Sequence, residues 1–145
     1  MQFKYNNFPH PAGGIVTRPV IQIRMRNLRM RSSPMILFEA LVDSGSDRCI
    51  FSSDIADLLG IDVRATDAVL YVGGVVAGRG RPIYIHPVEI EVAGNSCGVV
   101  EVGFMPEFSR SGYGLLGRSG FFDRFSFVKF RENENVLEIG RLRRV

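Results

Sequence analysis

The chain has 145 residues, of which 46% are hydrophobic, and this suits a single globular domain with a hydrophobic core. Its 18 Lys and Arg residues exceed its 15 Asp and Glu residues only slightly, and the formal net charge of +3 does not indicate a dedicated nucleic-acid binder. No apolar run reaches the roughly 20 residues that a membrane-spanning helix needs, and the stretch from Met1 to Pro11 is too polar for a secretory signal. We therefore expect a cytoplasmic protein without a membrane partner.

The N-terminal part of the chain differs in composition from the rest. Residues 1–17 include two prolines and two consecutive glycines, so we expect an arm without regular structure before a domain at 18–145. Val20 to Met25 alternates apolar and polar residues, which predicts a half-buried strand. Met35 to Val42 is more continuously apolar, and this predicts a strand that is buried on both faces and ends at Asp43.

The remainder of the chain is also rich in strand patterns. Arg48 to Phe51 reads as a short strand, and the serines that follow it can cap a helix from Asp54 to Leu59 that Gly60 ends. Five phenylalanines between 121 and 130 have a spacing typical of core packing. Further strands are expected at 69–72, Ile83–Val92, Val99–Met105, 125–130 and 136–139, with a helical turn at Gly120–Arg124. The pattern predicts an all-β domain with one or two short helices.

The apolar strand that ends at Asp43 delivers a carboxylate into the tight turn Ser44-Gly45-Ser46. Two such carboxylates side by side cannot both be ionised, because unit charges ~4 Å apart repel by roughly 4 kcal/mol at an effective dielectric constant of about 20. They share a proton instead, so that one oxygen can accept a proton from water while the other donates to a peptide carbonyl. Asp-Ser-Gly occurs once in the sequence, so a second copy of the chain would have to supply the second aspartate.

This segment resembles the active-site signature of the retropepsin family of aspartic proteases, which is Asp-Thr/Ser-Gly-Ala/Ser after a hydrophobic strand. A second match, Leu115-Leu116-Gly117-Arg118, stands where the family has two apolar residues, Gly and Arg before a short helix. The resemblance covers roughly Val20 to Ile139. It implies a closed β-barrel, a homodimer that hydrolyses polypeptides, and a reaction without a cofactor.

The resemblance also implies roles for individual residues. Asp43 of each subunit would be catalytic, and Ser44 would hydrogen-bond across to the other subunit. Gly45 and Ser46 would support the same loop. Asp47 and Arg118 occupy positions that form a salt bridge in the viral enzymes, and we expect that contact here. Ser119 departs from the family, because the viral enzymes often have Asp or Asn at this position.

A glycine-bearing hairpin, the flap, covers the cleft in this family, and its counterpart here would be Tyr71 to Arg81. The flap residues expected above the cleft are Tyr71, Val72, Gly73, Gly74 and Val75. The glycines of this stretch are less symmetrical than those of the viral hairpin.

Other functions fit parts of the sequence. A non-catalytic module with the same fold would bind extended peptides beneath the flap by strand addition. Gly112 to Ser119 contains Gly-x-Gly-x-x-Gly, but polar residues separate it from the preceding strand and the following helix is too short to bind phosphate. Arginines at 18, 24, 26, 29, 31, 141, 143 and 144 could attract RNA. Without interleaved exposed aromatic residues, we expect no nucleic-acid partner.

The metal-ligating residue types are isolated from one another. Neither Cys49 nor Cys97 has a neighbouring Cys or His at the spacing of a metal site, which predicts buried, reduced thiols. His10 and His86 each precede a proline, and we expect them in loops or at sheet edges. We therefore predict no metal site.

Overall fold

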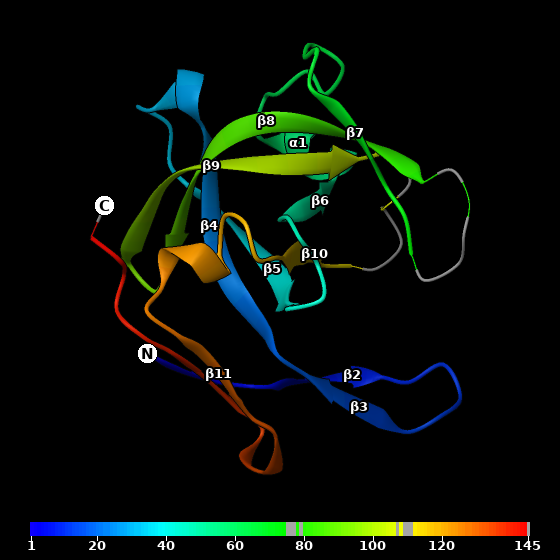
Figure 1. The fold of residues 1–145 in the computed structure, drawn as a ribbon, viewed down its shortest axis with the longest axis vertical. Coiled ribbons are helices and arrows are strands. Elements are labelled where there is room, and N and C mark those ends of the chain that lie inside the picture. The colour runs from blue at the N-terminus through cyan, green and yellow to red at the C-terminus, as the bar shows by residue number, and fades with distance from the viewer. Residues whose placement is uncertain (75–77, 79, 107, 109–111, 145) are drawn as a thin grey trace.

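The computed structural model describes residues 1–74, 78, 80–106, 108 and 112–144. A β-barrel forms its body, a small sheet lies beneath the barrel, and a hairpin projects from one side (Figure 1). The strands are β1 (Gln2–Lys4), β2 (Asn6–Pro9), β3 (Ile15–Arg18), β4 (Val20–Asn27), β5 (Ile36–Val42), β6 (Ile50–Ser52), β7 (Val69–Val72), β8 (Arg81–Val92), β9 (Asn95–Met105), β10 (Gly114–Leu116), β11 (Val128–Arg131) and β12 (Val136–Ile139). The helices are α1 (Ser53–Leu58) and the 3-10 turns η1 (Leu28–Met30), η2 (Phe122–Arg124) and η3 (Glu132–Glu134).

The barrel closes on itself. Its strands follow the order β4-β5-β10-β6-β9-β8, and β8 returns to pair with β4 through the register Arg24 to Glu91 and Asn27 to Val88. β5 runs parallel to β10 and β6 parallel to β9, whereas the other neighbours are antiparallel. β7 adds to β8 outside the ring. Because the ring is closed, each barrel strand is paired on both sides. The structure thus confirms the closed all-β fold that was predicted.

The hydrophobic core fills the barrel and continues to the small sheet. Alternate residues of β4 point inward, so that Ile21, Ile23 and Met25 are buried while Gln22 and Arg24 face solvent, as the sequence pattern predicts. Phe51 and Phe104 from the paired strands β6 and β9 are fully buried in the same cluster. Their burial stabilises the barrel by roughly 2 to 3 kcal/mol per side chain.

The burial predicted for the strand before Asp43 is wrong for its first half. Leu37 is 51% exposed, and continuous burial on this strand begins only near Ala40. The reason is that β5 pairs with β4 along most of its length, whereas β10 covers only Ala40 to Val42 on the other side. The last residues of β5 are therefore held from both sides, directly before Asp43.

The N-terminal segment is not the irregular arm that its composition suggests. β1 pairs with β12 in the sheet β1-β12-β11, and Tyr5 is buried in the core. β2 and β3 form a separate two-stranded hairpin with the register Asn6 to Arg18 and Pro9 to Ile15. Regular structure thus begins at Gln2, because backbone pairing with distant strands outweighs the local effect of proline and glycine.

Helix α1 has the capping serine and the terminal glycine that the sequence predicts, and it begins and ends one residue earlier than expected. The Ser52 side chain accepts a hydrogen bond from the amide of Asp54 (3.2 Å), and Gly60 ends the segment with φ +70°. Within the described residues, no helix has the length and apolar character needed to cross a membrane.

Only part of the phenylalanine cluster lies in the core. Phe121 and Phe125 are buried and contact each other edge to face, with ring centroids 5.2 Å apart. Phe127 and Phe130 are exposed, the former by 47%, so the core role predicted for them is wrong. They lie at or beside β11, which is an edge strand, and the solvent reaches this edge of the small sheet.

Both cysteines are free and buried, as predicted. Burial raises the pKa of the Cys49 thiol to about 12 and that of Cys97 to about 11, which keeps both protonated near neutral pH. His86 is not in a loop or at an edge, since it lies buried within β8 with its Nε2 atom 2.7 Å from the carbonyl oxygen of Val63. The carbonyl oxygen of Val63 gives the buried imidazole of His86 a hydrogen-bond partner inside the protein.

Candidate functional site

Asp43 follows β5 at the point where the barrel strands hold the chain from both sides. Its amide donates a hydrogen bond to the carbonyl oxygen of Leu116 (3.0 Å), one residue before Gly117. The carboxylate then accepts a hydrogen bond at Oδ1 from the amide of Gly45 (2.8 Å), and the amide of Ser46 donates to the Asp43 carbonyl (3.2 Å). The tight turn therefore fixes one carboxylate oxygen of a half-buried aspartate.

The second sequence motif packs directly against this turn. Leu116 pairs in parallel with Val42, and the amide of Arg118 donates to the carbonyl oxygen of Ser46 (2.8 Å). Gly117 has no room for a side chain, because a Cβ atom would lie 2.2 Å from the carbonyl oxygen of Arg48 and 2.6 Å from that of Ser46. The two motifs, far apart in the sequence, form one unit in space.

The segments that carry Asp47 and Arg118 are joined through the backbone. The amide of Ser119 donates to the carbonyl oxygen of Asp47 (2.8 Å), beside the bond that Arg118 makes to Ser46. Both side chains are exposed, and the ion pairs found among the described residues do not join these two. Backbone hydrogen bonds hold these segments together in the place of the expected salt bridge.

A cleft with a volume of about 620 Å³ opens over the Asp43 turn. It lies between the turn and the ribbon formed by β7 and the start of β8. Its lining residues are Asp43, Gly45, Ser46, Asp47, Arg48, Ile50, Leu70, Tyr71, Val72, Gly73, Met105, Phe108 and Leu115. Predicted site residues from two separate segments thus meet in one cleft.

The floor of the cleft is apolar and separate from the main core. Ile50, Ile83 and Ile85 form a small buried cluster, and partly buried apolar residues pack against it. These surrounding residues are Val72, Met105, Phe108 and Leu115, which also line the cleft. The site therefore offers apolar surface next to a positioned carboxylate.

The segment predicted as a flap begins as an antiparallel ribbon. Val72 pairs with Arg81 and Tyr71 with Pro82, and Tyr71 is 55% exposed at the cleft. A Cβ atom on Gly80 would lie 2.4 Å from the carbonyl oxygen of Val72, so glycine is needed for the two strands to approach here. Gly73 lines the cleft and Gly74 is exposed, whereas Val75 lies outside the described residues. Closure of the ribbon over a ligand stays a prediction.

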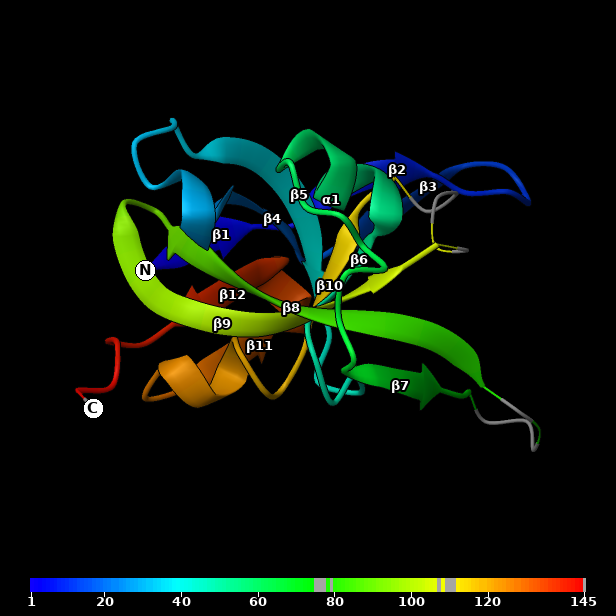
Figure 2. The ribbon, with the colours of Figure 1, turned by 90° about the horizontal axis from the view of Figure 1, so that it is seen from above.

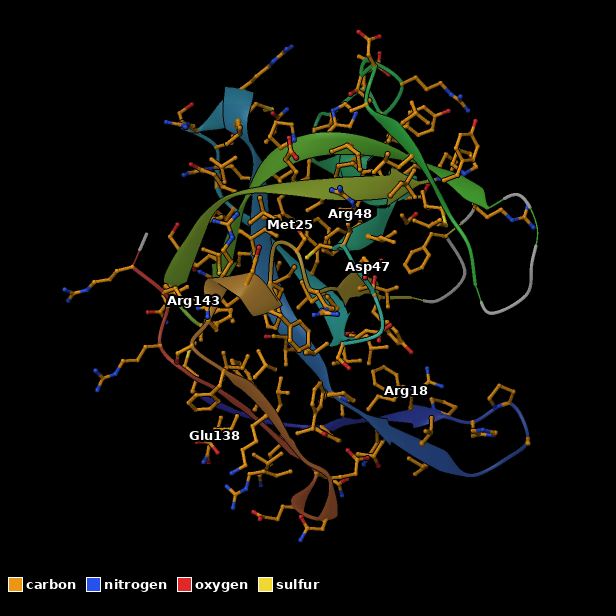
Figure 3. The ribbon with its side chains drawn as sticks, viewed as in Figure 1. Arg18, Met25, Asp47, Arg48, Glu138 and Arg143 are labelled. Carbon is orange, nitrogen blue, oxygen red and sulfur yellow. The ribbon has the colours of Figure 1, made fainter. Side chains whose placement is uncertain are left out.

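Some of the predicted site residues line the cleft, others do not, and the cleft includes residues that were not predicted. Ser44 is exposed at the turn and does not line the cleft, and neither does Arg118. Arg48 was missed, although its position next to Asp47 was a usable signal (Figure 3). Met105 and Phe108 come from the end of β9 and the residues after it, and no sequence pattern linked them to Asp43.

Two other kinds of site find little support in the geometry. Among the described residues, no group of three His, Cys, Asp or Glu side chains is arranged to hold a metal ion. Arginines of β4 pair with glutamates of β8, since Arg24 contacts Glu91 (3.6 Å) and Arg26 contacts Glu89. These pairs neutralise the strand that carries part of the predicted basic surface.

No protein-family model matches the sequence, and no curated protein matches it. The structure resembles that of a retropepsin-like aspartic protease from Rickettsia conorii, with 14% identity, a TM-score of 0.56, and coverage of 94% of this chain and 95% of that one. It also matches EIAV protease complexed with the inhibitor HBY-793, with 17% identity, a TM-score of 0.43, and coverage of 70% of this chain and 82% of the other. The first likeness spans nearly the whole of both chains, and it agrees with the closed barrel described above. The fold of this chain is therefore that of the retropepsin-like aspartic proteases.

Proposed function

We propose that the protein is an aspartic endopeptidase that acts as a homodimer, with one Asp43 from each subunit. The observation that carries this proposal is the meeting of Asp43 and the β7–β8 ribbon in one cleft. A fold shared with an aspartic protease supports the same conclusion. In this dimer the two Asp43 turns would lie side by side, and Ser44, which is exposed in the single chain, would face the other subunit.

The chemistry follows from two carboxylates that share one proton. The ionised carboxylate accepts a proton from a water molecule between the two aspartates, and the protonated one donates to the carbonyl oxygen of the scissile peptide bond. Gly45 contributes by donating its amide hydrogen to Oδ1 of Asp43, which fixes the plane of the carboxylate. The second oxygen is then available for the water.

The substrate in this proposal is an extended polypeptide. The apolar floor around Ile50 and Leu115 would take apolar side chains, while Tyr71 and the other residues of the ribbon would cover the backbone. An extended chain places alternate side chains on opposite faces, so it can use the floor and the ribbon at once.

The test compares the purified protein with the Asp43→Asn variant on an unfolded polypeptide at mildly acidic pH. We expect the variant to lose cleavage by at least about 1000-fold, because an amide neither shares the proton nor activates water. Asp57→Asn is the matched control, since Asp57 is exposed on α1 and does not line the cleft. Cleavage is measured by separating the products at several times.

Two results would count against the proposal. Equal cleavage by the wild-type and Asp43→Asn proteins would place the activity elsewhere. Binding of the polypeptide without cleavage at any pH would instead identify a non-catalytic peptide-binding module with this fold.

A further inference from the structure

Arg48 is unusual among the arginines of this chain. The described part of the chain contains five half-buried arginines, and four of them use their guanidinium groups in hydrogen bonds or ion pairs. These four pairs are Arg18 with Tyr113, Arg26 with Glu89, Arg124 with Val99 and Asp123, and Arg131 with Glu134. The side chain of Arg48 has no such partner within the described residues.

The backbone of Arg48 is held firmly nonetheless. Its carbonyl oxygen accepts a hydrogen bond from Oγ of Ser46 (2.7 Å), and the residue bridges to Ser119 in parallel orientation. The same carbonyl lies against Gly117, where no side chain fits. Arg48 is therefore presented to the cleft from a fixed base, two residues from the end of the Asp43 turn.

No ion pair balances the charge of the Arg48 guanidinium within the described structure. Arg48 is the one basic residue among the described lining of the cleft, and much of that lining is apolar. Asp43 and Asp47 also line the cleft, but neither forms an ion pair with Arg48 in the described structure. A partly dehydrated guanidinium without a carboxylate is unfavourable, and a ligand carboxylate would relieve this with paired hydrogen bonds.

On the basis of the proposed function, we propose that Arg48 makes this site select polypeptides with an acidic side chain, Glu or Asp, close to the cleaved bond. The guanidinium would bind the side-chain carboxylate in a two-pronged contact while neighbouring apolar residues occupy the floor. Because each subunit of the dimer contributes an Arg48, an acidic residue on either side of the cleaved bond can be recognised.

The experiment uses the full chain and matched peptides that carry Glu, Gln or Lys at each position near the cleaved bond. For the wild type, we expect kcat/KM to be roughly tenfold higher with Glu than with Gln at the selected position, as one charge-assisted pair of hydrogen bonds allows. For Arg48→Glu, we expect the preference to reverse in favour of Lys. Arg144→Glu, an exposed charge change outside the cleft lining, should keep the wild-type preference.

A second variant separates selection from folding. Arg48→Gln keeps a long polar side chain without the charge, so the ratio of its kcat/KM values for the Glu and Gln peptides should fall to about one. The inactive Asp43→Asn variant should bind the Glu peptide more tightly than the Gln peptide, by about the same factor as the two kcat/KM values differ in the wild type. This measurement tests the selection of the acidic side chain without cleavage.

The outcomes distinguish the two proposals. In one outcome, the wild type cleaves no peptide, but the Asp43→Asn variant binds Glu peptides more tightly than Gln peptides. This outcome contradicts the protease proposal and supports the role of Arg48. Cleavage with equal kcat/KM for Glu and Gln, or an unchanged Glu preference in Arg48→Gln, overturns the role of Arg48 and leaves the protease intact.

Discussion

Gly117 lies where the two motifs of the proposed site pack against each other. Its backbone lies against the carbonyl groups of Ser46 and Arg48, and the amide of the next residue, Arg118, donates into the same turn. A side chain at this position would meet backbone atoms, which cannot rotate away as a flexible side chain can. The turn that carries Asp43 therefore depends on the absence of a single methyl group.

We expect Gly117→Ala to lower the free energy of unfolding by about 3 kcal/mol, at the upper end of what overpacking costs. Gly73→Ala is the matched control, because a Cβ atom there meets nothing within 4 Å, and its effect should stay within roughly 0.5 kcal/mol. Chemical denaturation of both variants at one protein concentration measures the difference. Equal stability of the two variants would show that the turn adjusts to a side chain.

The residues of the proposed site that the sequence indicated are those that stand in short motifs. Asp43 and Gly45 stand in one short motif after an apolar strand, and Gly117 stands in the second. Arg48 stands beside Asp47 in the sequence, but only the structure shows that its side chain lines the cleft and has no partner among the described residues. Phe108 joins the cleft through packing of distant segments, and its neighbours in the sequence do not indicate this.

Among the elements, those with strong local signals were predicted best. Helix α1 has a serine cap and a terminal glycine, and β4 alternates clearly, so both appear where the pattern indicates. β1 and the β2–β3 hairpin were missed, because their pairing is decided by β12 and by the turn between them. Exposure along β5 also depends on how far its neighbour β10 extends.

The β8–β9 hairpin is the longest paired element of the barrel, and its turn contains a strained residue. Val92 pairs with Asn95, which leaves Ala93 and Gly94 as a two-residue loop with φ values of +47° and +78°. Such loops match the twist of the strands when both residues have positive φ, a conformation that favours glycine. Ala93 adopts it with an exposed side chain that gains no packing in return.

We expect Ala93→Gly to raise the free energy of unfolding by roughly 0.5 to 1 kcal/mol, because relief of the left-handed strain exceeds the added entropy of the unfolded chain. Ala65→Gly is the matched control, since Ala65 is exposed in a loop and its φ is not positive. That control should instead lose up to about 1 kcal/mol. Thermal unfolding of the two variants should therefore shift in opposite directions from the wild type, and a shift in the same direction would contradict the strain at Ala93.

At the scale of the whole molecule, the proposed mechanism needs a second carboxylate beside Asp43. The β2–β3 hairpin and the strands β7 and β8 extend from the same side of the barrel (Figures 1 and 2). Among the described residues, a single chain brings two carboxylates to the cleft, those of Asp43 and Asp47. The second carboxylate of the proposed mechanism therefore has two sources to compare, namely Asp47 of the same chain and Asp43 of a second copy.

Mixing wild-type protein with inactive Asp43→Asn protein separates these sources. If each site needs one Asp43 from each subunit, a fourfold excess of the variant leaves about one fifth of the wild-type chains in wild-type dimers, and cleavage falls to about one fifth. If Asp43 works with Asp47 of its own chain, the added variant leaves the rate unchanged, since every wild-type chain keeps a complete site. Subunits are mixed at a concentration that allows exchange, and sedimentation confirms the mass of the assembly. Asp47→Asn completes the comparison, because it should retain cleavage in the two-subunit mechanism and lose it in the other.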